Sequence, residues 1–278
     1  MVRGSGTLRV LSAVVFLPIF WVIVKKLGSG PYELLLLAAA LLGLFEMYGL
    51  AAARGMRVHR GLGVVVAVVI LASFALPGVR LEYGLVLALT TIPIASLLRG
   101  GDWGPALGEI GATLFASTFI GIFFGYLLAL RLLTDAPMGD ENGSDLVFLL
   151  FFIVWAGDTA AYFVGRFLGR RPLAPQVSPK KTIEGAIGGI LGSVLAAFVA
   201  RAWFMHRLRP IDGLVLGLVL GTVGMVGDLV ESMLKRGAGV KDSARLVPGH
   251  GGLLDRVDSL LYAAPVLYYY YQFAMKTS

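Results

Sequence analysis

The sequence of 278 residues contains no cysteine, which excludes disulfide bonds, thiolate metal sites and a cysteine nucleophile. Charged residues are also scarce, at 15% of the chain, whereas soluble globular domains carry roughly 25%. With 57% hydrophobic residues and a mean hydropathy of +0.82, the chain lacks the charged residues that would cover a soluble core. Much of its surface must therefore face lipid.

Long apolar runs are what the sequence has in abundance. About nine of them approach the roughly 20 residues needed to cross a bilayer, near 8–24, 32–53, 62–77, 83–98, 105–133, 146–168, 182–204, 211–232 and 260–274. The first resembles a signal peptide, but Lys25 and Lys26 follow it and no small-residue cleavage site is present, so we interpret it as a retained helix. We predict an all-α, polytopic transmembrane bundle of about nine helices.

Loop charge indicates how these helices are oriented, because cytoplasmic loops of membrane proteins are enriched in Lys and Arg. The loop at 134–145 contains acidic residues and no basic one, so we expect it outside. The next loop is expected in the cytoplasm because it contains Arg170, Arg171, Lys180 and Lys181. Alternation then places the polar loop 233–259 in the cytoplasm. The residues that contradict this pattern are Lys25, Lys26, Arg201, Arg207 and Arg209.

The net charge of +7 suits a protein that borders anionic lipid headgroups. The basic residues form short clusters between apolar runs, so we expect the bilayer, and not nucleic acid, as their partner. Glycines recur every four residues at Gly213, Gly217 and Gly221, and again at Gly185 and Gly189, or Gly188 and Gly192. Such spacing lets helices pack closely in lipid and leaves a homodimer open.

Acidic residues are concentrated in the polar segment 227–259. Asp228, Glu231 and Lys235 follow one another at i, i+3 and i+7, so they share one helix face. Asp255 and Asp258 repeat the i, i+3 spacing at the start of the last apolar run. Carboxylates at a membrane edge are costly and mark functional sites. Two such pairs on consecutive helices predict an all-oxygen site of the kind that Mg²⁺ prefers.

Basic residues and glycines lie between these carboxylates. The segment contains Lys235, Arg236, Lys241, Arg245 and His250, with glycines at 237, 239, 249, 251 and 252. Fixed positive charge and unobstructed backbone N–H groups are what a polyphosphate needs, so the combination indicates phosphate chemistry with a bridging metal. The alternative is a salt-bridged loop with an ordinary Glu231–Lys235 helix pair. The density of carboxylates at the helix ends argues against that alternative.

Two other acids lie inside apolar runs. Asp158 stands in the run Trp155-x-x-Asp-x-x-Ala-Tyr, which is followed by Ser178-Pro-Lys-Lys-x-x-Glu184-Gly. We include Asp158 among the candidate site residues. Glu46 lies deep in the run 32–53, but the sequence shows no partner for it and we assign it no role.

The polar segments resemble those of a known family. The run Ser232-x-Leu-Lys-Arg-x4-Lys-Asp-x5-Pro-x-His-Gly-Gly-x2-Asp255-Arg-x-Asp258 is similar to the signature of the phosphatidate cytidylyltransferases, also called CDP-diacylglycerol synthases. The runs around Asp158 and Ser178 resemble the same family. The resemblance is specific from about 155 to 265, by these motifs.

The resemblance implies a reaction in which CTP and phosphatidate give CDP-diacylglycerol and pyrophosphate with Mg²⁺, a second metal or a monovalent cation being left open. It implies a bacterial-type inner membrane, with the active site facing the cytoplasm. Residues 1–133 would form a scaffold or lipid cavity, and residues 134–278 the catalytic region. The implied catalytic residues are Asp228, Lys235, Arg236, Lys241, Asp242, His250, Asp255 and Arg256.

The resemblance also suggests individual roles. Asp228 and Asp255 are the first candidates for metal ligands, and Glu231 and Asp258 the second. Substrate binding is expected at Asp158, Ser178, Lys180, Lys181, Glu184, Gly251 and Gly252. A phosphate monoester is already largely ionised near neutral pH, with a second pKa of about 6. We therefore expect His250 to bind charge and not to serve as an essential proton acceptor.

Two alternatives remain from the sequence. A CTP-dependent polyprenol- or phytol-type lipid kinase would use the same nucleotide but transfer its γ-phosphate. A secondary transporter would use intramembrane carboxylates for ion coupling, although transporters often contain inverted repeats and none is evident here. The sequence also lacks a Gly-x4-Gly-Lys-Ser/Thr loop, which argues against a P-loop ATP-driven pump.

Overall fold

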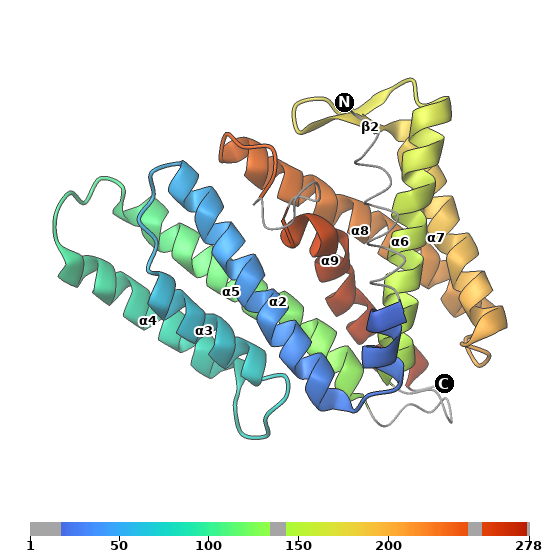
Figure 1. Cartoon of the computed structure of the whole chain (residues 1–278), viewed down its shortest axis with the longest axis horizontal. Coiled ribbons are helices and arrows are strands. Elements are labelled where there is room, and N and C mark those ends of the chain that lie inside the picture. The colour runs from blue at the N-terminus through green and yellow to red at the C-terminus, as the bar shows by residue number, and fades with distance from the viewer. Residues whose placement is uncertain (1–17, 134–142, 244–251, 277–278) are drawn as a thin grey trace. The chain divides into compact units, whose positions relative to one another are not determined.

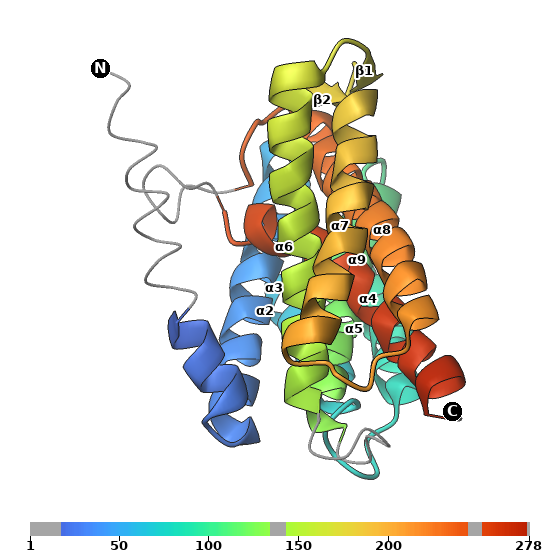
Figure 2. The ribbon, with the colours of Figure 1, turned by 90° about the vertical axis from the view of Figure 1, so that its right-hand side faces the viewer.

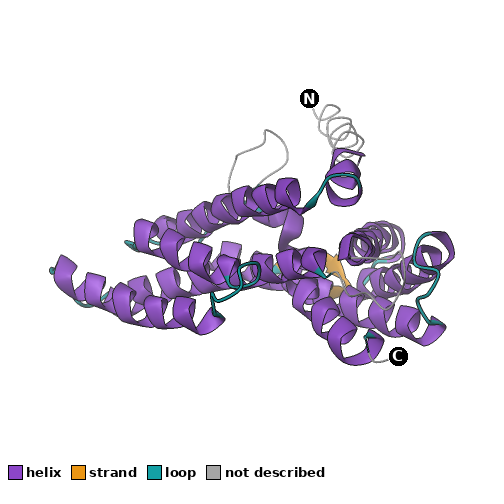
Figure 3. Ribbon diagram, turned by 90° about the horizontal axis from the view of Figure 1, so that it is seen from below, coloured by secondary structure: helices purple, strands orange, loops and turns teal. Residues whose placement is uncertain are grey.

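The computed structural model describes residues 18–133, 143–243 and 252–276, and helices form nearly all of this part (Figure 3). Residues 18–25 are helical. The elements that follow are α2 (Ser29–Ala53), α3 (Arg60–Ala72), α4 (Leu81–Arg99), α5 (Ala106–Leu132), α6 (Gly143–Leu168), β1 (Pro172–Ala174), β2 (Ser178–Thr182), α7 (Ile183–Trp203), α8 (Pro210–Gly237), α9 (Leu254–Tyr270) and the π-helix η1 (Tyr271–Met275). The predicted all-α, polytopic fold is confirmed.

Six helices of the described part are long and apolar enough to cross a membrane, namely α2, α4, α5, α6, α7 and α8. The predicted run 62–77 forms α3, which has 13 residues and is only about 20 Å long at 1.5 Å per residue. The last run begins earlier than predicted, at Leu254, and α9 has 17 residues. Most of the run 8–24 lies outside the described residues. The chain is an integral membrane protein.

A short hairpin was not expected from the sequence. Strands β1 and β2 pair antiparallel, with Pro172 opposite Thr182 and Ala174 opposite Ser178. Thr182 also ends the hairpin as the N-cap of α7, where its hydroxyl accepts a hydrogen bond from the Gly185 amide at 3.1 Å. The hairpin places Lys180 and Lys181 on adjacent strand positions, which point to opposite faces.

The chain divides into two compact units. The first consists of Met1–Ala129 and Leu234–Arg256, and the second of Leu130–Met233 and Val257–Ser278. The division crosses α8 after Met233 and α9 after Arg256. Part of the polar segment, residues 234–256, therefore belongs with the N-terminal helices.

Close helix packing in the first unit involves α3 and α4, which run side by side in Figure 1. Val66, Ile70, Ala88 and Ile92 form a buried core between them. Gly84 permits this approach, since a Cβ there would lie 2.4 Å from the Ile70 side chain. Because lipid offers no hydrophobic force that pulls helices together, such close packing is what holds them.

Most glycines of the predicted close-packing pattern lie at helix contacts in the second unit, but Gly213 does not, since the nearest atom to a Cβ there is 3.8 Å away. Helices α6 and α7 lie along each other in both Figure 1 and Figure 2, and a Cβ on Gly192 would lie 2.4 Å from Ala160. A Cβ on Gly217 of α8 would lie 2.4 Å from the Cα of Val194 in α7. Small residues therefore set the spacing of these helices.

Replacing Gly217 with alanine is expected to destabilise the protein, because the new methyl group would meet backbone atoms that cannot rotate away. Overpacking of this kind typically costs about 1–3 kcal/mol. The matched control is Gly213→Ala in the same helix, where the nearest atom to a new Cβ is 3.8 Å away. Thermal unfolding in detergent should show a lower midpoint for the first variant and an unchanged one for the second. Equal midpoints would contradict this account of the packing.

Arg209, which breaks the charge rule, has a local structural role in the second unit. Its guanidinium forms an ion pair with the buried Asp212 at 2.7 Å, and the Tyr270 hydroxyl donates to the same carboxylate at 2.8 Å. Arg201 likewise donates to the Leu208 carbonyl at 2.8 Å. Arg201, in the last turn of α7, and Arg209, just before α8, therefore have partners within the protein, which accounts for their presence on the side expected outside.

Candidate active site

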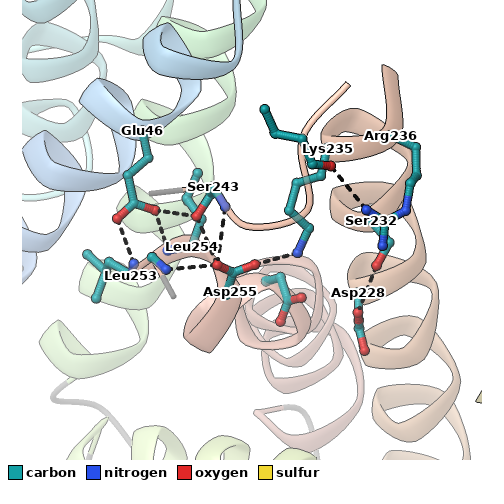
Figure 4. A network of polar contacts seen from close by, with 12 residues as sticks. Glu46, Asp228, Ser232, Lys235, Arg236, Ser243, Leu253, Leu254 and Asp255 are labelled. Atoms are coloured by element: carbon teal, nitrogen blue, oxygen red, sulfur yellow. Dashed lines mark hydrogen bonds and ion pairs between the residues drawn. The ribbon is translucent and has the colours of Figure 1, made fainter. Parts of the chain in front are cut away.

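Asp255 lies in the first turn of α9 and belongs to the first unit. Its Oδ2 accepts hydrogen bonds from the Gly252 amide at 2.8 Å and from the Ser243 hydroxyl at 3.1 Å. Its Oδ1 forms an ion pair with the ammonium group of Lys235 in the last turn of α8 (Figure 4). The carboxylate is thus held from two sides by groups that favour its ionised form.

These contacts decide the charge of Asp255. Burial alone would raise the pKa of this carboxyl, but the hydrogen bonds from Lys235, Gly252 and Ser243 outweigh burial and hold the pKa below its ordinary value. The side chains of Lys235 and Asp255 are only 9% and 17% exposed. A buried pair of this kind is costly to break by removing one member.

The end of α8 is shaped by a glycine. Gly239 has a φ of 74°, a left-handed conformation that residues with a Cβ rarely adopt. The Gly239 amide donates to the Arg236 carbonyl at 3.0 Å, and the Val240 amide to the Lys235 carbonyl at 3.0 Å. This C-terminal cap satisfies the last carbonyls of the helix and ends it just after Lys235 and Arg236.

Glu46 of α2 is a residue that sequence reasoning missed. Its side chain is buried, and its carboxylate accepts hydrogen bonds from the amides of Leu253 and Leu254 and from the Ser243 hydroxyl (Figure 4). The only signal in the sequence was an acid inside an apolar run. Its partners lie about 200 positions further along the chain, by the numbering of the bonded residues.

A second cluster of charged residues lies in the second unit. Lys181 of β2 forms an ion pair with Asp228 of α8, with 2.5 Å between the Nζ and Oδ2 atoms. Asp158 of α6 interacts electrostatically with both residues, and Asp258 of α9 interacts with Asp228 and Asp158. Four separate elements therefore bring three carboxylates and one ammonium group into mutual range.

The same cluster contains two carboxyl groups in direct contact. The side chains of Asp258 and Glu231 share a hydrogen bond, and Glu231 is buried. Two carboxyl groups in contact require a proton or a cation between them, because like charges at this distance oppose ionisation. The cluster therefore has an excess of negative charge that a bound cation would offset.

The donor set fits the magnesium ion that the sequence predicts. Within the described ranges no three His, Cys, Asp or Glu side chains lie together in a ready-made metal site. Mg²⁺ does not require one, since it retains several waters and is usually bound by one or two carboxylates together with substrate phosphates. The Lys181 ammonium already occupies a position against Asp228 where positive charge is favourable. Asp158, Asp228 and Asp258 offer carboxylate oxygens, of which one or two would bind the ion together with substrate phosphates. Asp255, the other first candidate for a metal ligand, has its described contacts with Lys235, Gly252 and Ser243 in the first unit.

The other predicted site residues have varied surroundings. Glu184 accepts hydrogen bonds from the amides of Arg170 and Arg171 at 3.0 and 3.2 Å, which ties the hairpin to the start of α7. A Cβ on Gly252 would lie 1.9 Å from the Ser243 hydroxyl oxygen and 2.4 Å from Glu46 Oε2, so this position has no room for a side chain. Exposed predicted site residues are Lys180, Arg236, Lys241, Asp242 and Arg256, and Ser178 is half-buried. His250 and Gly251 lie outside the described residues.

Comparison with known proteins agrees with the family that the sequence motifs suggest. The model of the cytidylyltransferase family matches residues 7–274. A phosphatidate cytidylyltransferase from Bacillus subtilis is 35% identical over 266 residues, which cover 94% of each chain. Phosphatidate cytidylyltransferases from Synechocystis and Haemophilus influenzae are 40% and 42% identical over 181 and 168 residues, covering 56% and 58% of this chain and 61% and 57% of the relatives. With a family model that matches nearly its whole length, the chain belongs to the cytidylyltransferase family.

Proposed function

We propose that this protein is a phosphatidate cytidylyltransferase, which transfers CMP from CTP to phosphatidate and releases CDP-diacylglycerol and pyrophosphate. The observation that carries the proposal is the Asp158–Lys181–Asp228–Asp258 cluster of an integral membrane protein, in a chain that matches a relative of this name over 94% of its length. The cluster has the mixture of carboxylates and fixed positive charge that nucleotidyl transfer needs.

The reaction joins two anions, which repel each other unless positive charge offsets them. A phosphate oxygen of phosphatidate forms a bond to the α-phosphorus of CTP, while the bond from that phosphorus to the bridging oxygen of the β-phosphate breaks. The bonding electrons leave with pyrophosphate. Because the attacking phosphate is already largely ionised, with a second pKa of about 6, the step needs no strong general base.

The residues of the second unit would serve to hold charge in place. Lys181 lies against Asp228 and would exchange this contact for a phosphate oxygen when substrate binds, since an ammonium group is a good point-charge partner for phosphate. One or two of Asp158, Asp228 and Asp258 would hold Mg²⁺ together with substrate phosphates, and Glu231 shares a hydrogen bond with Asp258. When bound, the ion supplies charge neutralisation on the phosphates and a template that orients them.

In the first unit, Lys235 is a further candidate for binding the triphosphate. Its ammonium group is held by Asp255, whose ionisation is secured by the Gly252 amide and the Ser243 hydroxyl. A cation held in advance in a low-dielectric site needs no reorganisation when charge moves during the reaction. Arg236 and Lys241, which are exposed, would bind the triphosphate as well.

The location of the site follows from charge asymmetry. The hairpin segment carries Arg170, Arg171, Lys180 and Lys181, and basic loops are typical of the cytoplasmic side. CTP is a water-borne nucleotide, so a site on that side would receive it directly. We propose a bacterial cell membrane as the location, which the bacterial organisms of the relatives support. The basic hairpin segment supports an active site that faces the cytoplasm.

A labelling experiment tests the proposed function. Purified protein is incubated with phosphatidate, Mg²⁺ and CTP that is labelled at either the α- or the γ-position. We expect α-label to enter the lipid phase and γ-label to be released as pyrophosphate. Removal of Mg²⁺ with EDTA should abolish the transfer, and re-addition should restore it, because the carboxylate cluster alone repels the triphosphate.

The alternatives give different products in the same experiment. Entry of γ-label into the lipid would identify a lipid kinase and overturn the proposal. Label in neither lipid nor pyrophosphate, from protein that remains folded in detergent, would also overturn it and favour a transporter. Transfer that continues in EDTA would contradict the magnesium requirement while leaving the reaction itself in place.

A further inference from the structure

Helix α2 contributes a buried carboxylate whose position calls for an explanation. Glu46 is 3% exposed, and burying a carboxylate is expensive unless hydrogen bonds compensate it. Oε1 accepts from the Leu253 amide at 2.6 Å, and Oε2 accepts from the Leu254 amide at 2.9 Å and from the Ser243 hydroxyl at 2.9 Å. Glu46 is thus bound by the start of α9 and by Ser243, which precedes that helix in the chain.

The amides that donate to Glu46 lie at the N-terminal end of α9, where backbone N–H groups need an acceptor from outside the helix. The first N–H groups of a helix have no acceptor within it, and negative charge there is favourable. The amides of Leu253 and Leu254 donate to the Glu46 carboxylate, whereas the amide of Gly252 donates to Asp255. Consecutive amides therefore hold two carboxylates, one from α2 and one from α9 itself.

Ser243 connects the two carboxylates. Its hydroxyl oxygen lies 2.9 Å from Glu46 Oε2 and 3.1 Å from Asp255 Oδ2. A hydroxyl group has a single hydrogen, so the two acceptors must share it. A change at Glu46 therefore alters what Ser243 offers to Asp255, and through Asp255 it alters the hold on Lys235 (Figure 4).

Close packing around Glu46 restricts the movement of its carboxylate. A Cβ on Gly252 would lie 2.4 Å from Glu46 Oε2 and 1.9 Å from Ser243 Oγ, so the Glu46 carboxylate lies directly against the backbone. Three residues before Glu46 in α2, a Cβ on Gly43 would lie 3.1 Å from Leu254 Cδ2. One face of α2, from Gly43 to Glu46, is thus fitted closely to the start of α9.

From this geometry we infer that Glu46 is a positioning residue for the proposed transfer reaction. It binds the start of α9 and Ser243, and thereby fixes the orientation of Asp255 and of the Lys235 ammonium group. The inference rests on the proposed function. It also gives α2 a definite role, since this helix then holds the residues around Asp255.

The test compares Glu46→Gln with Glu33→Gln, which removes a carboxylate from a half-buried position of the same helix. In Glu46→Gln one oxygen becomes an NH₂ group, which cannot accept a hydrogen bond from an amide or a hydroxyl. We expect kcat for cytidylyl transfer to fall about 10- to 100-fold, the size of losing a hydrogen bond to a charged group. Glu33→Gln should retain wild-type kcat. Rates are compared at a temperature well below the unfolding midpoint of each variant.

A double-mutant cycle separates positioning from a general loss of structure. If Glu46 acts through Ser243, Glu46→Gln combined with Ser243→Ala should lower kcat little more than the more harmful single change, because coupled residues are not additive. A double variant whose fold-loss of kcat equals the product of the two single fold-losses would contradict the inference. Hydrogen exchange provides a readout without any substrate: Glu46→Gln should speed exchange of the Leu253 and Leu254 amides, and Glu33→Gln should not.

The outcomes distinguish this inference from the proposed function. Inactive wild-type protein would overturn the proposed function. Active wild-type protein with unchanged kcat in Glu46→Gln would overturn the positioning role alone, even if the amides exchanged faster. Unchanged exchange in Glu46→Gln would show that the carboxylate does not hold the start of α9, and this too would overturn the inference.

Discussion

Replacing Asp228 with asparagine is expected to lower kcat for cytidylyl transfer by about 10³-fold, in line with the loss of a group that organises charge in the transition state. Asp228 contacts Lys181 at 2.5 Å and interacts with Asp158 and Asp258. Asparagine keeps the shape of the side chain but removes the charge, so Lys181 loses its ion-pair partner and the proposed magnesium site loses its central ligand.

The Mg²⁺ dependence of the rate shows whether Asp228 acts through the ion. We expect the magnesium concentration for half-maximal rate to rise strongly in Asp228→Asn, while the unfolding midpoint changes little. Glu82→Gln is the matched control. Glu82 of α4 is an exposed acid that forms an ion pair with Arg80 at 2.7 Å, and it lies outside the cluster. An Asp228→Asn protein with wild-type kcat and an unchanged magnesium requirement would remove Asp228 from the site.

Replacing Asp255 with asparagine is expected to reduce both stability and activity. Asp255 and Lys235 form a pair whose side chains are 17% and 9% exposed, and removing one member of a buried pair typically costs about 3–5 kcal/mol. The variant also loses the ionised carboxylate that holds Lys235. We expect a clear drop in the unfolding midpoint in detergent, and little transfer activity at any temperature at which the variant is folded.

A double variant separates these two effects of Asp255. Replacing the pair by apolar residues in Lys235→Met/Asp255→Leu removes both charges together, and such replacements are often neutral or stabilising. We expect this protein to regain much of the lost unfolding midpoint but to remain inactive. Recovery of activity together with stability would mean that the pair serves folding alone. A single Asp255→Asn variant as stable as the wild type would contradict the assigned burial of the pair.

The membrane fold could be predicted because it depends on local composition. An apolar run of sufficient length forms a helix in lipid whatever its neighbours are, since every backbone group must find a partner within the segment. That reasoning correctly gave the polytopic helical fold and the close packing at Gly217. It failed for α3, whose 13 residues end before the apolar run does, because apolarity alone does not show where a helix stops.

The β-hairpin and the partners of Glu46 could not be predicted from the sequence, for different reasons. Strand β2 has the sequence Ser-Pro-Lys-Lys-Thr, which lacks the alternating apolar residues that indicate a strand. Glu46 is 197 positions from Ser243 and 208 from Leu254, and a single sequence contains no information about a contact at that distance. The candidate site could be predicted in part, since Lys235 with Asp255 and Lys181 with Asp228 come together among the residues that the motifs selected.

The discontinuous first unit has a consequence for how the protein is made. Glu46 leaves the ribosome 207 residues before Leu253, a delay of roughly 10–40 s at a synthesis rate of about 5–20 residues per second. During that interval the carboxylate of α2 enters the membrane without the amides that will bind it. Until the last helix emerges, this carboxyl group must be solvated by water or carry a proton, because an unpaired carboxylate in lipid is costly. The contacts of Glu46 with Leu253 and Leu254 can therefore form only late in synthesis, and a ribosome that stalls near residue 240 would leave this acid without them.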